Sequence, residues 1–265
     1  MNAIPSHLFL LCTAVVLAGC RKPEPGPAPS APAGRTHEVA PLAPGQGSVT
    51  GRVRLVGPLE LPAHPTTASV AHVCGSEIAD GSLSVDASGA LAEAVVYLDV
   101  EEGPVLEGTR AAVVDQRGCR YLPAVLAARA GTTVKVRNSD PLVHNVRSVS
   151  EGRSIFNVAM PLEGTSIDRP LPAKAGVVAI GCDLHPWMRA TVRTFKHDWF
   201  TVTDASGAFR LEGLPEGRHT LKVWHPRLPE QSFELELGPG PTPALEVSWR
   251  AEQVREIEAL PRSQR

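Results

Sequence analysis

The sequence lacks an excess of charge of either sign. Its 265 residues include 26 Lys and Arg and 28 Asp and Glu, which gives a formal net charge of −2. A balance this close to neutral, with no basic run, gives no support for nucleic-acid binding. After residue 18 the sequence also lacks any apolar stretch long enough to span a membrane as a helix.

One apolar run, LFLLCTAVVLA at residues 8–18, is too short to span a bilayer but has the length of a signal-peptide core. It runs into Leu17-Ala18-Gly19-Cys20, which resembles the bacterial lipobox, in which the cysteine is diacylated and becomes the new N-terminus. This resemblance implies a signal peptide at residues 1–19 and lipidation of Cys20. The segment MNAIPSH departs from the pattern, because it has no Lys or Arg. The alternative is an ordinary secretory signal in which Cys20 is incidental, and both interpretations predict export.

Residues 20–46 are rich in Pro, Ala and Gly and have almost nothing to bury. Such a segment is expected to form a semi-rigid spacer of about 3.1 Å per residue. We therefore expect a lipid-anchored protein on the periplasmic side of a bacterial membrane. Arg21 is compatible with outer-membrane sorting, by resemblance to the lipoprotein rules of some bacteria.

Short β-branched runs separated by Gly, Pro, Asn and Asp make up the rest of the chain. Their number and spacing predict an all-β fold of the sandwich or barrel type. The Ala-rich stretch at residues 124–130 is only two helical turns long and lies between Pro123 and Gly131, so an extended or irregular segment is expected there. The clearest predicted strands are residues 48–56, 94–100, 132–137, 177–180, 189–195, 208–211 and 219–223.

Residues 202–209, VTDASGAF, and then LPEG at residues 214–217 resemble the small transthyretin-like β-sandwich that is appended to carboxypeptidases. The glycines permit tight turns, and Phe209 and Leu221 would point into a core. The resemblance implies a fold and no activity.

The five cysteines can be sorted by position. Cys12 would leave with the signal peptide, and Cys20 would carry lipid. Cys74, Cys119 and Cys182 then remain in an oxidising compartment, where an odd cysteine needs an explanation.

Residues 182–188, CDLHPWM, supply a thiol, an imidazole and a thioether within one loop. Soft sulfur donors together with imidazole favour copper, particularly Cu(I), over hard cations. A second imidazole is needed to complete a His₂Cys set with a weak axial Met. His144 is the best candidate, because a predicted strand leads through the turn NSDP directly to it.

Two segments resemble the cupredoxins, the blue copper proteins. Residues 130–146, AGTTVKVRNSDPLVHNV, resemble their first-histidine region, and residues 181–190, GCDLHPWMRA, resemble the short ligand loop of amicyanin. The resemblance covers roughly residues 120–195 and implies a Greek-key cupredoxin-like sandwich or barrel with one type 1 copper. It also implies that Asn145 tethers the two loops near the thiolate. Carried over residue by residue, it implies as copper ligands His144, Cys182, His185 and Met188.

The chain departs from simple cupredoxins in an insertion-like stretch at residues 148–167, in Gly181 where an aromatic residue is common, and in a long segment before the copper domain. As a whole it resembles exported bacterial proteins labelled plastocyanin-like or methylamine-utilisation-like. The expected organisation after the spacer is a β-rich extension at 47–118, the copper domain at 119–198, the carboxypeptidase-like module at 199–250 and a polar tail at 251–265.

With Cys182 assigned to metal, Cys74 and Cys119 are expected to form a disulfide. Closing a loop of about 46 residues would stabilise the fold by roughly 4 kcal/mol in the chain-entropy model. The alternative is that Cys74 and the nearby His72 help to bind a second metal. A disulfide that used Cys182 would abolish the copper interpretation.

The resemblance implies a non-enzymatic role, one-electron transfer between periplasmic redox partners such as a c-type cytochrome. Pro186 and Trp187, beside His185, form the expected docking patch, although Trp187 could instead pack across the end of the barrel. A zinc or regulatory copper site could use the same residues, and Met188 could be a core residue. The alternative functions are copper sensing, storage or delivery, and a non-redox structural role at the cell surface. A copper oxidase is not expected, because too few His residues lie in paired motifs.

Overall fold

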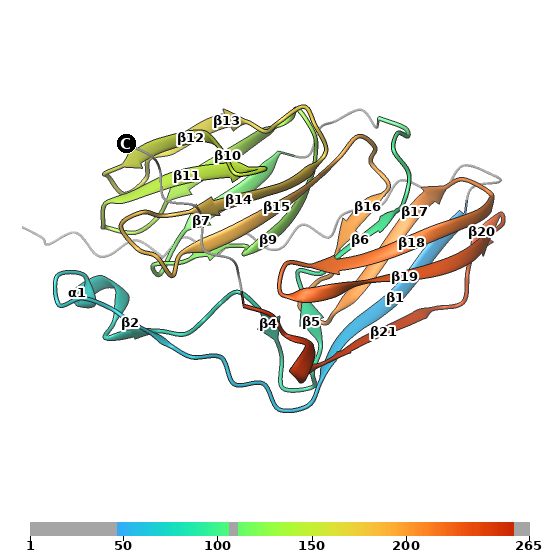
Figure 1. Cartoon of the computed structure of the whole chain (residues 1–265), viewed down its shortest axis with the longest axis horizontal. Helices are drawn as coiled ribbons and strands as arrows, with labels where there is room; N and C mark the ends of the chain where they lie inside the picture. Colours follow the sequence, from blue (N-terminus) through green and yellow to red (C-terminus); the bar gives the residue numbers. More distant parts are fainter. Residues whose placement is uncertain (1–46, 106–110, 257–265) are drawn as a thin grey trace, which may run out of the picture. The chain divides into compact units, whose positions relative to one another are not determined.

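The computed structural model describes residues 47–105 and 111–256 (Figure 1). These belong to the second of the two units into which the chain divides, Pro41–Arg265. The signal peptide, Cys20, the spacer and the end of the polar tail, predicted at residues 1–46 and 257–265, lie outside the described residues. Within them the fold is all-β, as predicted, with one helix, α1 (Ala71–Cys74), and one 3-10 turn, Ala251–Gln253. No helix in these ranges is long and apolar enough to cross a membrane.

The first β-sandwich consists of two sheets that share one core. The strand orders are β13-β10-β7-β8 and β12-β11-β14-β15-β9. Val134 and Val136 of one sheet pack with Ile180 and Val192 of the other, because alternate side chains of each strand point inward. The strands are β7 (Ala112–Gln116), β8 (Tyr121–Leu122), β9 (Val125–Arg129), β10 (Thr133–Asn138), β11 (His144–Ser150), β12 (Arg153–Met160), β13 (Ser166–Pro170), β14 (Gly176–Gly181) and β15 (Arg189–Phe195). The Ala-rich stretch is thus mostly the strand β9, in agreement with the expected extended segment.

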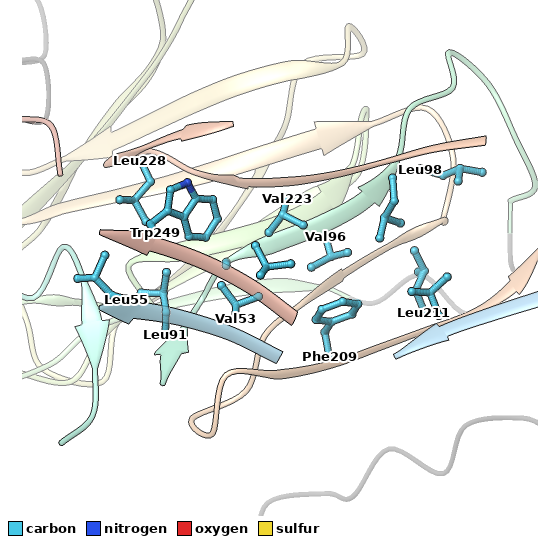
Figure 2. Packing of buried hydrophobic residues seen from close by; sticks show 14 of the residues in the cluster. Val53, Leu55, Leu91, Val96, Leu98, Phe209, Leu211, Val223, Leu228 and Trp249 are labelled. Atoms are coloured by element: carbon cyan, nitrogen blue, oxygen red, sulfur yellow. The ribbon is translucent and has the colours of Figure 1, made fainter. Parts of the chain in front are cut away.

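The second β-sandwich has one sheet in the order β17-β1-β20, with β21 also paired to β1, and another in the order β16-β6-β18-β19. Figure 2 shows its core, in which Trp249, Phe209 and aliphatic side chains from both sheets meet. The strands are β1 (Gly47–Val56), β6 (Val95–Leu98), β16 (Phe200–Val202), β17 (Ala208–Leu214), β18 (Gly217–His225), β19 (Leu228–Leu237), β20 (Gly240–Pro241) and β21 (Leu245–Arg250).

The segment at residues 47–118 contributes strands to both sandwiches, which differs from the expected division into an extension and two domains. β1 and β6 belong to the second sandwich, whereas β7 belongs to the first. The reason is that β1 fills the gap between β17 and β21, antiparallel to one and parallel to the other. Gly51 permits this close approach, because a Cβ there would lie 2.2 Å from the Leu245 carbonyl oxygen and 2.6 Å from the Phe209 ring.

Residues 64–82, which we call the strap, carry β2 (His64–Pro65), α1 and β3 (Glu77–Ile78), and the short pair β4 (Ser84–Val85) and β5 (Leu91–Ala92) follows. The predicted disulfide is confirmed: Cys74 of α1 is bonded to Cys119, with the Cα atoms 5.5 Å apart. Since the Cys74 sulfur is used in this bond, a second metal site at His72 and Cys74 is not formed.

Candidate metal centre

Two loops at one end of the first sandwich carry the predicted ligands. His144 is the first residue of β11, and residues 182–188 connect β14 to β15. β11 and β14 are antiparallel neighbours, with Arg147 opposite Gly181. This register brings the start of β11 next to the end of β14, so residues 37 positions apart in sequence meet, and the Asn145 amide N lies 3.5 Å from Cys182 Sγ.

Three of the four predicted ligands converge. Nδ1 of His144 lies 2.9 Å from Nδ1 of His185, which in turn lies 3.5 Å from Sγ of Cys182. One donor atom from each residue lies within 4.8 Å of the other two. All three side chains are buried, with exposed fractions of 0, 4 and 5 % for His144, His185 and Cys182. A thiol and two imidazoles therefore face one small volume that is shielded from water.

The orientation of His144 is set by Asp140, four residues earlier. Nε2 of His144 donates a hydrogen bond to Oδ2 of Asp140 at 3.0 Å, so Nδ1 is the ring atom that faces His185 and Cys182 and could bind a metal. Asp140 also accepts hydrogen bonds from the backbone amides of Gly118 and Cys119. Burial alone would raise the pKa of Asp140, but these three hydrogen bonds lower it overall, so the carboxyl group is held as the anion.

Asn145 ties the two loops together. Its Oδ1 accepts a hydrogen bond from the Asp183 amide at 2.7 Å and lies 3.2 Å from Cys182 Sγ. Its Nδ2 donates to Asp183 Oδ2 and to Asn157 Oδ1. This geometry agrees with the tethering position that the resemblance implied for Asn145. The side-chain hydrogen bonds restrict movement of the loop, while the Asn145 backbone amide, 3.5 Å from Sγ, is the group of this residue that can donate to a thiolate.

Met188 and Trp187 lie in the same loop but differ in what they contact. Met188 is 1 % exposed and belongs to the same buried cluster as Cys182, a place that suits both a core residue and a weak axial ligand. Trp187 is half-buried, and its Nε1 donates to the Cys119 carbonyl at 3.1 Å, so packing is part of its role. Pro186 is exposed, as a docking residue must be.

The metal-free thiol of Cys182 should titrate far below its ordinary pKa of 9.0. Burial raises the pKa, but hydrogen bonds from His144 and His185 and from the Asn145 and Leu184 amides lower it overall to about 6. Ultraviolet absorbance of the thiolate, taken as the difference between the chain and its Cys182→Ser variant, should show a midpoint near pH 6. His144→Ala should raise this midpoint, because one of the stabilising hydrogen bonds is lost. A midpoint at the ordinary value would contradict the hydrogen bonding described.

The donor set fits copper. A thiolate and two imidazoles without a carboxylate among the converging atoms favour a soft or borderline metal over Mg²⁺ or Ca²⁺. The Asp140 carboxylate, which contacts His144 on the Nε2 side, is already engaged by His144 and two amides. Sequence reasoning treated Asp140 only as part of a turn and missed its contact with His144. The four-residue spacing of Asp140 and His144 was the available signal, but the contribution of Gly118 and Cys119 is tertiary.

Comparisons with known proteins give a partial result. No model of a protein family matches the chain, and no curated protein matches it. Solved structures match over about a third of it. A purple cupredoxin from Nitrosopumilus maritimus is 28 % identical, covers 31 % of this chain and 98 % of its own, and has a TM-score of 0.27. A methionine-to-alanine mutant of amicyanin with Cu(I) is 24 % identical, covers 37 % and 97 %, and has a TM-score of 0.28.

A copper-containing nitrite reductase from Thermus scotoductus SA-01 is 21 % identical and covers 36 % of this chain and 25 % of its own, with a TM-score of 0.28. These neighbours have cupredoxin folds, but all three TM-scores are below 0.5. The function is therefore inferred from the geometry of the site. The resemblance of residues 199–250 to the carboxypeptidase module stays a prediction.

Proposed function

We propose that this chain is a type 1 copper protein that transfers single electrons between redox partners. The observation that carries the proposal is the convergence of His144, Cys182 and His185 in a buried, hydrogen-bonded site. When bound there, copper supplies one-electron chemistry between Cu(I) and Cu(II). These three residues would hold it, and the Met188 thioether, buried in the same cluster as Cys182, would be a fourth, weaker ligand.

The role of the protein is to keep the ligands in one arrangement. Asp140 fixes the His144 ring, and Asn145 holds the loop that carries Cys182. A buried site whose ligands are held by such contacts changes little when an electron arrives, which favours fast transfer. No substrate and no general acid or base is needed, so the proposed role is not enzymatic.

A redox partner would dock near the ligand loops. Among the exposed large hydrophobic residues are Val143, Leu162 and Leu184, with exposed fractions of 45, 69 and 54 %. Val143 precedes His144, and Leu184 precedes His185. Leu162 is tied to the loop before His144, because Asn138 Nδ2 donates hydrogen bonds to the carbonyls of both Leu142 and Leu162. Short-lived redox complexes use small interfaces. We propose a c-type cytochrome or a similar carrier as the partner, and a lipid anchor on the periplasmic side of a bacterial membrane.

The test is the visible and electron spin resonance spectrum of the metal-free full-length chain after addition of Cu(II). We expect an intense thiolate-to-Cu(II) absorption at one equivalent, bleached by a one-electron reductant and restored by reoxidation. The matched control is Cys182→Ser, which keeps a polar atom but removes the thiolate and should stay colourless. A wild-type chain without this absorption, or with a spectrum that Cys182→Ser leaves unchanged, would defeat the proposal. Exchangeable Cu(I) binding without the absorption would favour copper storage or delivery.

A further inference from the structure

Cys119, which is bonded to the strap, contacts both ligand loops. Cys119 is completely buried and is bonded to Cys74 of the strap. Its amide donates a hydrogen bond to Asp140 Oδ2 at 2.9 Å, and its carbonyl accepts one from Trp187 Nε1 at 3.1 Å. Asp140 belongs to the loop before His144, whereas Trp187 belongs to the loop of the other two converging ligands. Cys119 is therefore hydrogen-bonded directly to one residue of each ligand loop.

The turn at Cys119 has a conformation that needs support. Gly118 and Cys119 both have positive φ, 59° and 56°. Glycine adopts this region freely, but a residue with a Cβ does so only where other contacts hold it there. The two successive amides of this turn point at the same carboxylate, Gly118 to Oδ1 of Asp140 at 2.6 Å and Cys119 to Oδ2. Paired amides of this kind form a small concave anion site.

The Asp140 carboxylate, held by these two amides, determines the orientation of the His144 ring. Asp140 is 4 % exposed, and its Oδ2 accepts the Nε2–H of His144. That hydrogen bond fixes the rotation of the ring, with Nε2 held at Asp140 and Nδ1 directed at His185. A shift of the turn at Cys119 would move Asp140 and so release the ring.

We propose that the Cys74–Cys119 disulfide is a positioning element of the metal centre, acting through Asp140 on the His144 imidazole. The inference rests on the proposed function only in that His144 is a metal ligand. Without the cross-link, the strap would keep its packing in the cluster that Val70, Val73 and Ile78 share with Leu142 and Trp187, but would lose its covalent tie to the turn. The environment of the metal then depends on whether the disulfide is formed.

A double-mutant cycle in the full-length chain tests this coupling. Its members are Cys74→Ser/Cys119→Ser, Asp140→Asn and the combination of the two. The probe is Co(II), whose thiolate absorption reports binding and does not depend on electron transfer. Asp140→Asn should lower Co(II) affinity by about 10- to 100-fold, the usual cost of losing the partner of a ligating His. The disulfide-free variant should lose affinity in the same direction, and the combined variant should lose no more than Asp140→Asn alone.

A second measurement needs no metal. In the wild-type chain the Nε2–H of His144 should give a sharp, hydrogen-bonded imidazole signal in ¹⁵N-edited NMR, and this signal should broaden or disappear in the disulfide-free variant. Leu221→Ala is the control, because it removes a completely buried side chain from the core of the second sandwich and lowers stability without contact with the site. It should leave both the NMR signal and the Co(II) affinity unchanged.

Three results would overturn the inference: a disulfide-free variant with wild-type affinity and an unchanged His144 signal, losses that simply add to those of Asp140→Asn, or the same losses in Leu221→Ala. Failure of this inference can be distinguished from failure of the proposed function. A wild-type chain that fails to give the copper absorption defeats electron transfer, yet its Co(II) affinity and its metal-free NMR signal still read out the coupling. A blue wild-type chain with an additive cycle defeats only the role of the disulfide.

Discussion

Replacing His144 with alanine should lower the affinity of the chain for Cu(II) by at least about 100-fold, because loss of a residue that merely supports a ligand already costs about 10- to 100-fold. Among residues 47–105 and 111–256, His144, Cys182 and His185 are the only group of three or more His, Cys, Asp or Glu side chains that could hold a metal. The variant therefore keeps only two of the three converging donor residues, Cys182 and His185. Competition with a chromophoric chelator, or calorimetric titration, measures the change.

The control for this prediction must separate loss of a ligand from loss of stability. His144 is completely buried, so its removal leaves a cavity and an Asp140 carboxylate without its imidazole partner. His197→Ala removes an imidazole that is also buried, with 1 % exposed, and that lies outside the converging group. It should lower the melting temperature but leave Cu(II) affinity within about twofold. Equal losses of affinity in the two variants would show that His144 acts through the fold and not as a ligand.

The local part of the site could be predicted from the sequence. Cys182, His185 and Met188 lie within seven residues, and the strand before His144 ends in a recognisable turn. These signals are properties of short segments, and the structure places β15 at the predicted residues 189–195. The prediction of His144 rests on a predicted strand that leads through a turn to it and on the resemblance to cupredoxins. The structure places that strand, β10, in the opposite sheet from β14, whereas His144 itself begins β11, the neighbour of β14.

The non-local part could not be predicted in the same way. The parallel pairing of β1 with β21 joins residues near 50 to residues near 248, and the sequence of neither segment indicates which strand it pairs with. The same limit applies to the turn at Cys119, whose amides bind a carboxylate 21 and 22 residues further along the chain. Cysteine counting gave the disulfide, but only the register of the folded strands shows that it ends beside the metal centre.

Burial of single histidines was also invisible in the sequence. His225 is 1 % exposed at the end of β18. Its Nδ1 accepts a hydrogen bond from the Arg227 amide at 3.2 Å, and its Nε2 is buried without a partner among the described residues. Burial, and secondarily the charge of Arg227, lowers the pKa of His225 to about 3. The folded chain therefore keeps this imidazole neutral well below its ordinary pKa.

This buried imidazole should make stability fall steeply in acid. Below about pH 6.5 the unfolded chain takes up a proton at His225, whereas the folded chain does not until about pH 3. The extra proton favours the unfolded state, so the contribution of His225 is fully present above pH 6.5 and is lost as the pH falls. The expected slope is about 1.4 kcal/mol of unfolding free energy for each pH unit in this window.

Urea unfolding of the chain and of His225→Asn at several pH values between about 4.5 and 7 measures this contribution as a difference. The asparagine Oδ1 can still accept the hydrogen bond from Arg227 but cannot be protonated in this range, so the variant should lose less stability per pH unit than the wild type. Other groups, such as Asp80, whose pKa is lowered overall by Ser82 and Arg227 against the effect of burial, titrate in both proteins and cancel in the difference. His219→Asn, a partly exposed imidazole on the same strand, controls for the substitution itself. If the free energy of unfolding varied with pH in the same way in the wild type and in His225→Asn, then His225 would not stay neutral in the folded chain, and the prediction would be wrong.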